Sequence, residues 1–317
     1  MDFAKSLGPS VLPPIPPTPA LGEASREFSL ESETLSSGER TTLYWALRLM
    51  QAPESQALAA RIPGGNRLAF GFLDPEFEQN NFGVIVLAAS GAESPVRGES
   101  ELLSPIVVDG HPFPAVVRRI VEQRQLAPPT VTFPKIGSSA AWARSRITST
   151  APIGPGVLTA KHVTTHWLGT VCTLSCGCVG TVDDVAPECI DAALVRLPAQ
   201  CPHNPPPGAQ WRKRRLVAPA AAVHLHAPSG IVRTTITATT NLLNLTTAPE
   251  LPIRVLLANH GVPGDSGSLI EETRTGLAVG LYMGKYTAPR AGSLGQTGGL
   301  AQHIGQVCEL MQMELYK

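Results

Sequence analysis

The stretch Asn259-His260-Gly261-Val262-Pro263-Gly264-Asp265-Ser266-Gly267-Ser268 is the most informative part of the chain. In it Gly264 and Gly267 enclose an aspartate and a serine, and glycine allows the backbone conformations that tight turns require. On such a turn, backbone N–H groups can converge beside the hydroxyl of Ser266 and stabilise negative charge on a neighbouring oxygen atom. The alternative is an ordinary turn rich in Gly, Asp and Ser, without a chemical role.

Two upstream stretches each carry one notable polar side chain within an apolar flank. The first is Leu158-Thr159-Ala160-Lys161-His162-Val163, and the second is Ile190-Asp191-Ala192-Ala193-Leu194-Val195-Arg196-Leu197. An aspartate in an apolar strand needs a partner, because burying an unpaired carboxylate is costly, and a histidine N–H is a suitable one. The alternatives are a satisfied or exposed His162 and an Asp191 that faces water at a strand edge.

Together the three stretches resemble the trypsin/chymotrypsin clan of serine proteases. Their side chains come in the order His162, Asp191, Ser266, which is the order of the chymotrypsin triad and differs from that of subtilisin and the α/β-hydrolases. LTAKHV resembles the clan's TAxH segment, DAALVRL its DIALxxL segment, and GDSGS its GDSGG segment. The short loops and the terminal helix resemble the HtrA-like and glutamyl-endopeptidase-like branches more than secreted trypsin. The resemblance covers about residues 137–317.

The resemblance implies a serine endopeptidase that works through an acyl-enzyme without a cofactor or a metal. Ser266 would be the nucleophile, and His162 the general base and then the general acid. Asp191 would orient the imidazole and stabilise its charged form. The N–H groups of Gly264 and Ser266 would form the oxyanion hole, where one donor is worth roughly 2.7–4 kcal/mol.

The same resemblance suggests where a substrate binds. Gly280-Leu281-Tyr282-Met283-Gly284 resembles the strand that lines the substrate channel, so Gly280, Tyr282 and Met283 are expected to contact substrate. His260 stands where the family places the floor of the S1 pocket. The absence of an aspartate there argues against a preference for Arg or Lys, and a histidine could favour acidic or uncharged side chains. The alternative is a loop histidine outside the pocket.

Two features depart from the family pattern. Ser268 replaces the second glycine after the serine, a change that some branches tolerate. In trypsin-like zymogens a new N-terminus pairs with the aspartate of GDSG, but this chain has no IVGG-like start before the predicted barrel. Asp265 is therefore expected to form local hydrogen bonds, unless cleavage elsewhere activates the protein.

Composition and periodicity favour a mainly β fold. The 317 residues include 29 glycines and 30 prolines and are 43% hydrophobic, which suits many short strands separated by turns. The resemblance implies a chymotrypsin-like double antiparallel β-barrel, with two six-stranded barrels and the active site between them. Helical spacing over 300–315 predicts a C-terminal helix. The short apolar runs that predict strands are 138–147, 156–163, 167–174, 178–182, 190–197, 214–218, 221–226, 230–239, 253–258, 267–271 and 276–284.

The N-terminal part has a different pattern. Residues 1–20 are expected to be a flexible Pro-rich arm, and 21–130 a small α+β region before a protease domain at 131–317. The pattern predicts helices over 39–62 that break at Pro53, a strand over 82–89, and a hairpin of 106–108 with 115–117. Because this region lacks a catalytic motif, we expect it to regulate the protease or to bind a partner protein.

Charge and targeting signals exclude several classes of partner. The formal net charge is zero, which does not favour nucleic acid as a partner. The sequence has no apolar run that is long enough to span a membrane and no recognisable secretion signal. We therefore expect a cytoplasmic protein with reduced cysteines, acting on protein or peptide substrates.

Two weaker signals and one rival function stay open at this stage. Cys172, Cys176, Cys178, Cys189 and Cys201 form a cluster that suits buried thiols better than zinc or a disulfide, because the spacings do not match paired Cys-x2-Cys motifs. The run Arg212-Lys213-Arg214-Arg215 is best interpreted as solvated loop charges, although a nucleic-acid patch, a cleavage site or a localisation signal would also fit. The rival function is a catalytically silent protease-like scaffold that binds peptides or partner proteins.

Overall fold

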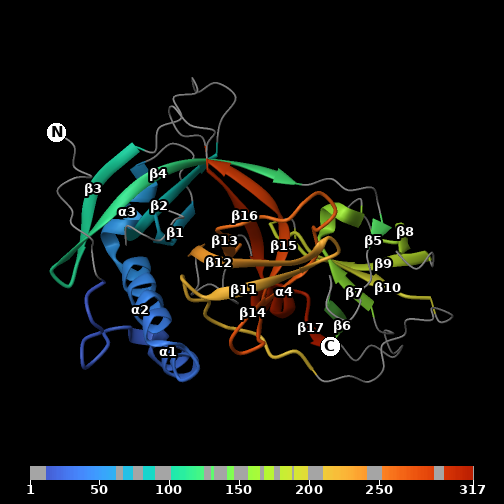
Figure 1. Ribbon diagram of the computed structural model, residues 1–317, viewed down its shortest axis with the longest axis horizontal. Coiled ribbons are helices and arrows are strands. Elements are labelled where there is room, and N and C mark those ends of the chain that lie inside the picture. Colours follow the sequence, from blue (N-terminus) through green and yellow to red (C-terminus); the bar gives the residue numbers. More distant parts are fainter. Residues whose placement is uncertain are drawn as a thin grey trace.

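The computed structural model is mainly β, with helices near both ends of the chain (Figure 1). The mainly β class predicted from composition and periodicity is therefore confirmed. The described residues are 12–61, 67–73, 81–89, 101–124, 130–131, 141–145, 156–164, 168–174, 179–187, 189–198, 210–240, 252–288 and 296–316.

Six strands form a closed barrel at the centre of the molecule. Each pairs with the next in the order β11, β14, β15, β16, β13 and β12, and β12 pairs again with β11. Alternate residues face the interior, so that Val223, Leu225 and Ala227 of β11 are buried. The strands are β11 (Ala222–Ala227), β12 (Gly230–Thr240), β13 (Arg254–Leu257), β14 (Leu269–Glu272), β15 (Ala278–Ala288) and β16 (Gln296–His303).

A second sheet has the strand order β17-β6-β7-β10-β9-β8-β5. In the part of the chain that the structure describes, its pairings leave it open at β17 and β5, whereas the resemblance implied a second closed barrel. Its last pairing, β5 with β8, is parallel and joins only two residue pairs. The strands are β5 (Thr130–Val131), β6 (Ala141–Ser145), β7 (Gly156–Thr159), β8 (Val171–Leu174), β9 (Val179–Val185), β10 (Ala193–Arg196) and β17 (Met313–Tyr316).

The N-terminal strands extend the barrel rather than forming a sheet of their own. β1 pairs with β12, β1 with β2, β2 with β4, and β4 with both β3 and β15. The strands β12, β1, β2, β4, β15, β16 and β13 therefore make a second closed circuit, which shares four strands with the barrel. The N-terminal strands are β1 (Arg67–Phe72), β2 (Phe82–Ala89), β3 (Glu101–Val108) and β4 (His111–Arg124). The predicted strand is confirmed as β2, and the predicted hairpin is present as β3 and β4. Its register differs from the prediction, because 106–108 pair with 111–113 and 115–117 pair with 101–103.

Local signals explain the helices near the N-terminus, α1 (Ser25–Ser32), α2 (Ser37–Gln51) and α3 (Pro53–Arg61). The helix α2 begins with a capping box, in which the Glu39 N–H donates to Ser36 Oγ and the Ser36 N–H donates to Glu39 Oε2. It ends before the extended Ala52, because proline disfavours helical backbone in the residue that precedes it. The predicted break between α2 and α3 is confirmed.

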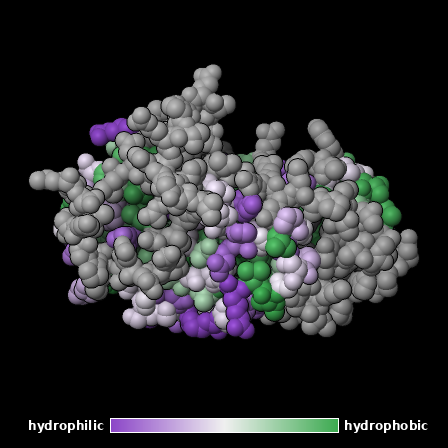
Figure 2. All heavy atoms as spheres, turned by 45° about the horizontal axis from the view of Figure 1, so that its top comes forward, coloured by the Kyte–Doolittle hydropathy of each residue, from purple (hydrophilic) through white to green (hydrophobic). Residues whose placement is uncertain are grey.

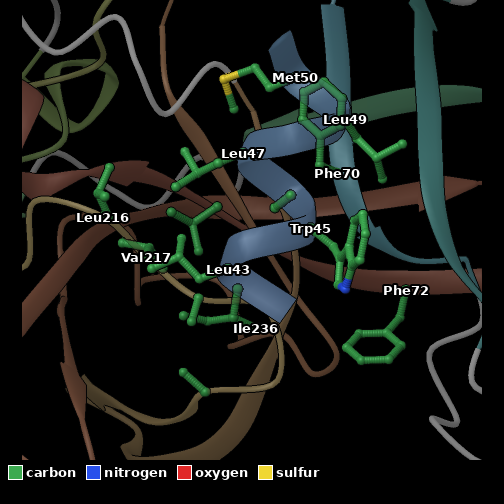
Figure 3. Packing of buried hydrophobic residues seen from close by; sticks show 14 of the residues in the cluster. Leu43, Trp45, Leu47, Leu49, Met50, Phe70, Phe72, Leu216, Val217 and Ile236 are labelled. Carbon is green, nitrogen blue, oxygen red and sulfur yellow. The ribbon is translucent and has the colours of Figure 1, made fainter. Parts of the chain in front are cut away.

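The helix α2 packs against the closed barrel (Figure 3). Its Leu43 and Leu47 share one buried cluster with Leu216 and Val217, which precede β11, and with Ile236 of β12. Each fully buried leucine of this kind contributes about 1.5–3 kcal/mol. The N-terminal helices and the barrel therefore have a common core, and the division of the chain at residue 130 stays a prediction.

The Pro-rich arm is described from residue 12 onwards and touches α2. The indole N–H of Trp45 donates to Pro13 O at 2.7 Å, and Arg48 Nη1 donates to Ala20 O at 2.9 Å. Residues 1–11 lie outside the described part of the chain. These two bonds attach residues 13–20 to the helix, and the flexibility of the arm stays a prediction.

The basic run beside β11 includes one buried ion-pair centre. Arg214 is only 2% exposed, and its Nε and Nη2 donate to Glu272 Oε2 at 2.8 and 2.6 Å. Its Nη1 donates to Glu31 of α1 and to Thr34, both at 2.6 Å. The interpretation as solvated loop charges is thus wrong for Arg214, because partners supplied by α1 and β14 compensate its burial. Arg215 remains exposed and pairs with Glu27.

The C-terminal helix is shorter than predicted. The helix α4 spans Ile304–Leu310, while the residues before it belong to β16 and those after it to β17. The helical spacing over 300–315 was misleading, because the strands on both sides also bury apolar residues such as Leu300 and Met313. His303 caps α4 by accepting the Gln306 N–H at its Nδ1.

The surface mixes hydrophilic and hydrophobic residues (Figure 2). Exposed hydrophobic residues gather at the end of the molecule formed by β8 and β9, where Leu168, Val171 and Val179 are each more than half exposed. Within the described ranges, no helix combines the length and hydropathy that crossing a membrane would require.

Candidate active site

His162 and Asp191 are brought together by two adjacent strands of the open sheet. β7 and β10 pair antiparallel, with Thr159 opposite Ala193. His162 follows β7 in a short 3-10 helix, and Asp191 precedes β10 by two residues. Because antiparallel strands place the end of one beside the start of the other, both side chains fall at the same edge.

The carboxylate of Asp191 binds both the ring and the backbone of His162. Its Oδ2 lies 2.6 Å from His162 Nδ1, and its Oδ1 accepts the His162 N–H at 3.0 Å. Both residues are buried, at 4% and 6% exposure. With Nδ1 donating to the carboxylate, the ring is held in the tautomer whose Nε2 carries a free lone pair.

The other ring nitrogen of His162 is buried and lacks a hydrogen-bond partner among the described residues. Leaving a buried polar atom unsatisfied typically costs about 1–3 kcal/mol. Such an atom in a folded protein calls for an explanation, and one explanation is a role in proton transfer. The nitrogen is therefore available to accept a proton from a bound group or a neighbouring hydroxyl.

Ser266 lies on a turn that glycine makes possible. Gly264 and Gly267 have φ values of +100° and +90°, in the left-handed region that other residues rarely adopt. The turn is held by Asp265 N–H donating to Val262 O at 3.1 Å. It is joined to β15 by Gly267 N–H donating to Tyr282 O at 2.7 Å. The predicted tight turn is thus present.

The hydroxyl of Ser266 donates to the backbone carbonyl of Met283 at 2.9 Å. Within the described structure, no hydrogen bond joins it to His162, whose Nε2 is unpartnered. The N–H groups of Gly264 and Ser266 have no protein acceptor in the described ranges. Gly264 and Ser266 therefore each keep an unused amide donor on the serine turn in the described structure.

The turn meets the histidine strand directly. A Cβ atom added at Gly267 would collide with Thr159 Oγ1 and would lie 3.0 Å from Ala160 N. Thr159 is the last residue of β7, and Ala160 stands two residues before His162. The turn from the closed barrel and the segment that carries His162 are therefore in close contact, and a side chain at residue 267 would push them apart.

Asp265 forms local hydrogen bonds, as expected for a chain without an IVGG-like start. Its Oδ2 accepts the Ser229 hydroxyl and the Val262 N–H, both at 2.8 Å, and its Oδ1 accepts the Ser229 N–H at 3.3 Å. At 1% exposure the carboxylate needs these donors. Ser229 has no sequence signature beyond the hairpin turn Pro228-Ser229-Gly230, so sequence reasoning missed it.

The residues expected to bind substrate have varied environments. Gly280 lies in the barrel wall, paired with Ile270. The Tyr282 ring is fully buried, its hydroxyl accepts the Gly261 N–H at 2.9 Å, and burial raises the pKa of this phenol. The Met283 side chain is 2% exposed, so its carbonyl is the part that reaches the serine.

His260 is exposed beside the serine turn, and its Nδ1 lies 2.7 Å from Gly261 O. This placement is compatible with either interpretation of the histidine, the pocket floor or a loop position. Its role in selecting a substrate therefore stays a prediction.

The structure describes three of the cysteines. Cys172 and Cys308 are buried and Cys189 is partly buried, and burial raises the pKa of the Cys172 thiol. Cys176, Cys178 and Cys201 lie outside the described residues. In the remainder, no three His, Cys, Asp or Glu side chains form a group that could hold a metal ion.

Comparison with known proteins adds an independent finding. No protein-family model matches the chain, and no curated protein matches it. Similar solved structures do exist, and those reported below cover 56–59% of this chain at 17–18% identity. The structures that it resembles are chymotrypsin-like serine proteases.

Three of these chymotrypsin-like structures illustrate the identity, the coverage and the TM-score of the matches. Nocardiopsis protease (NAPase) is 17% identical with a TM-score of 0.39, over 59% of this chain and all of that one. A glutamic acid-specific serine protease described with a histidine triad in substrate binding is 18% identical with a TM-score of 0.39, over 56% and 93%. The HtrA-type protease AlgW with a decapeptide is 18% identical with a TM-score of 0.35, over 56% and 63%.

The resemblance that the three motifs indicated is therefore found again when whole structures are compared. At such low identity and TM-score it says nothing about which side chains act. The case for an activity rests on the contacts of His162, Asp191 and Ser266.

Proposed function

We propose that the protein is a serine endopeptidase in which His162, Asp191 and Ser266 form the catalytic triad. The observation that carries the proposal is the buried His162 imidazole, bonded to Asp191 through Nδ1 and unpartnered at Nε2. It follows directly on a segment that touches the Ser266 turn. A nucleophile, a base and an orienting carboxylate are the parts that acyl transfer needs.

Catalysis would begin with rotation of the Ser266 side chain from Met283 O towards His162 Nε2. His162 would take the hydroxyl proton while Oγ attacks the scissile carbonyl carbon, and it would then give that proton to the leaving amine. Asp191 would stabilise the imidazolium in between. Water would hydrolyse the resulting ester by the same steps in reverse, which restores Ser266.

The oxyanion of the tetrahedral intermediate would be bound by the N–H groups of Gly264 and Ser266. Their lack of protein acceptors in the described structure supports this assignment. Because both donors are fixed by the turn before substrate arrives, they can stabilise the transition state without reorganisation.

A fluorophosphonate probe tests the proposal, because it labels only an activated serine. We expect labelling of the full chain and its loss in Ser266→Ala and in His162→Ala. Ser268→Ala is the matched control, since Ser268 is also buried, lies two residues away, and its hydroxyl has no described partner. Absence of labelling in the wild-type chain would reject the proposal.

One observation favours the rival function, a catalytically silent scaffold that binds peptides or partner proteins. Ser266 Oγ is bonded to Met283 O, so the hydroxyl is not poised against His162 in this conformation. A silent scaffold would bind peptides without being labelled by the probe. The same experiment therefore separates the two functions.

Specificity, regulation and location belong to the same proposal. We propose protein or peptide substrates, a regulatory or partner-binding role for residues 21–130, and action in the cytoplasm. The common core of α2 and the barrel supports a regulatory coupling. Profiling the new N-termini that the enzyme generates in a peptide library tests activity and the contribution of His260 together. An unchanged profile in His260→Ala would place that residue outside the pocket.

A further inference from the structure

The carboxylate of Asp265 is bonded to the hairpin turn that joins β11 to β12. At 1% exposure it needs hydrogen-bond donors, because an unsatisfied buried carboxylate is costly. Its donors in the described structure are the hydroxyl and the N–H of Ser229 and the N–H of Val262. All three are neutral groups, and Ser229, which is exposed on the hairpin turn, supplies two of them. The burial of Asp265 therefore depends mainly on one residue of a distant loop.

The hydroxyl of Ser229 makes the stronger of its two contacts with Asp265. It lies 2.8 Å from Asp265 Oδ2, whereas the Ser229 N–H lies 3.3 Å from Oδ1, beyond the usual limit of about 3.2 Å. A hydrogen bond to an ionised acceptor is roughly twice as strong as one between neutral groups. Loss of this hydroxyl would leave the carboxylate with the Val262 N–H as its one short donor in the described structure.

The serine turn needs an anchor of this kind, because glycines stand on both sides of Asp265 and Ser266. Gly264 and Gly267 have φ values of +100° and +90°. Glycine makes these conformations accessible, but it also has the most conformational freedom to lose. The proposed reaction releases the Ser266 hydroxyl from Met283 O, which removes one contact between the turn and β15. The hydrogen bonds of the Asp265 side chain then hold the part of the turn that precedes Ser266.

Asp265 also stands between the two amide donors that the proposed function assigns to the oxyanion hole. The N–H of Gly264 precedes it and that of Ser266 follows it, so a change in its backbone angles reorients one relative to the other. Its N–H donates to Val262 O at 3.1 Å while its side chain accepts the Val262 N–H. A Cβ added at Gly261 would lie 2.6 Å from Asp265 Oδ2, so the loop packs closely on the carboxylate. The position of this carboxylate is therefore coupled to the direction of both donors.

We propose that Ser229 is a positioning residue for catalysis, whose hydroxyl holds Asp265 and thereby keeps the two amide donors of the serine turn in place. The inference rests on the proposed function of Ser266. In this role Ser229 acts through Asp265. The donors bind the oxyanion, which forms only as the reaction proceeds, so a displaced turn should lower kcat and leave KM nearly unchanged.

The test compares Ser229→Ala and Ser229→Thr with the wild-type full chain. The rate of fluorophosphonate labelling is measured for each, and so is hydrolysis of a library peptide that the wild-type chain cleaves. We expect Ser229→Ala to lower kcat by about ten- to a hundredfold, because a hydrogen bond to a charged group is lost, and to slow labelling in parallel. KM should stay close to the wild-type value. Ser229→Thr keeps a hydroxyl and should restore most of kcat.

Two further variants control for effects outside this contact. Ser29→Ala is the matched control, since Ser29 is also exposed and its hydroxyl donates at 2.8 Å to Ser25 O within α1. It should keep the wild-type kcat. Asp265→Ala removes the acceptor, so adding Ser229→Ala to it should cause no further loss of kcat. Where Asp265→Ala does not fold, the two substitutions of Ser229 decide the matter.

The outcomes separate this role from the proposed function. A wild-type chain that the probe does not label overturns the proposed function. With a labelled wild-type chain, the positioning role alone is overturned by unchanged rates in Ser229→Ala, by a change confined to KM, or by a Ser229→Thr variant as slow as Ser229→Ala. A loss of kcat that matches the loss of folded protein in urea unfolding also overturns it, because the hydroxyl would then serve stability only.

Discussion

The sheet that carries His162 and Asp191 and the barrel that carries Ser266 are built differently. The barrel is closed and is covered by α2 and the N-terminal strands, whereas the other sheet is open in its described pairings. The barrel side is also held by the buried Arg214 ion pairs. The difference shows that the two sides of one proposed site depend on different stabilising contacts, which can be removed one at a time.

The largest expected effect comes from removing one reacting group from either side. We expect Ser266→Ala in the barrel and His162→Ala in the sheet each to lower kcat by about 10⁴–10⁶-fold, and the double variant to be no slower, because the groups act as a unit. Peptide hydrolysis under saturating substrate measures this. Additive losses would contradict the joint action of the two sides.

Removing the buried cation should weaken the barrel side selectively. Arg214→Met removes an ion-pair partner of the Glu272 carboxylate, whose side chain is 2% exposed. The substitution should therefore lower the free energy of unfolding by about 3–5 kcal/mol. Arg215→Met is the matched control, since its side chain is 55% exposed and its ion pair contributes at most about 1 kcal/mol. Urea unfolding measures both, and equal losses would rule out a special role for Arg214.

The pH dependence of stability tests the contribution of His303, which lies between the two sheets. His303 ends β16 of the barrel and caps α4, which leads to β17 of the open sheet. Burial lowers the pKa of His303 from its ordinary value of 6.5 to about 4 in the folded protein. Between these values the unfolded state binds more protons, so the free energy of unfolding should fall by roughly 3 kcal/mol as the pH drops from 6.5 to 4.

His303→Asn provides the control for this titration. Asparagine retains a side chain that can cap α4, but it does not titrate. The variant should therefore show a shallower loss of stability over the same pH range in urea unfolding. Parallel pH profiles for the two proteins would show that His303 is not responsible.

The smallest expected effect concerns the contact between the two sides. Gly267→Ala adds a Cβ against Thr159 at a φ of +90°, and should lower the free energy of unfolding by about 1–3 kcal/mol. Gly264→Ala has a similar φ but no atom within 4 Å of the new Cβ, so it reports backbone strain alone. Thr159→Ala should recover part of the Gly267→Ala loss but none of the Gly264→Ala loss.

Much of the molecule was predictable where a local signal exists. Helical spacing over 39–62 and the break at Pro53 indicate α2 and α3, and short apolar runs indicate most of the barrel strands. The motifs around His162 and Asp191 were informative because a buried carboxylate and a histidine explain one another. Their joint role with Ser266 stays a proposal.

Other features had no local signal. The strand β17 follows α4 so closely that a single helical stripe seemed to cover both. The strand β16 contains Gly298 and Gly299, and glycine is not typical of strands. The burial of Arg214 depends on Glu31 and Glu272, which lie far from it in the sequence.

The sequence by itself determined the mainly β class, the helices α2 and α3 and three short motifs whose side chains suit acyl transfer. Only the tertiary structure decided that His162 binds Asp191, that Arg214 is buried, and that β4 runs along β15. The physical reason is that local periodicity and turn residues act over a few positions. Strand pairing uses backbone groups that every residue carries, so its partner and register depend on the packing of the whole chain.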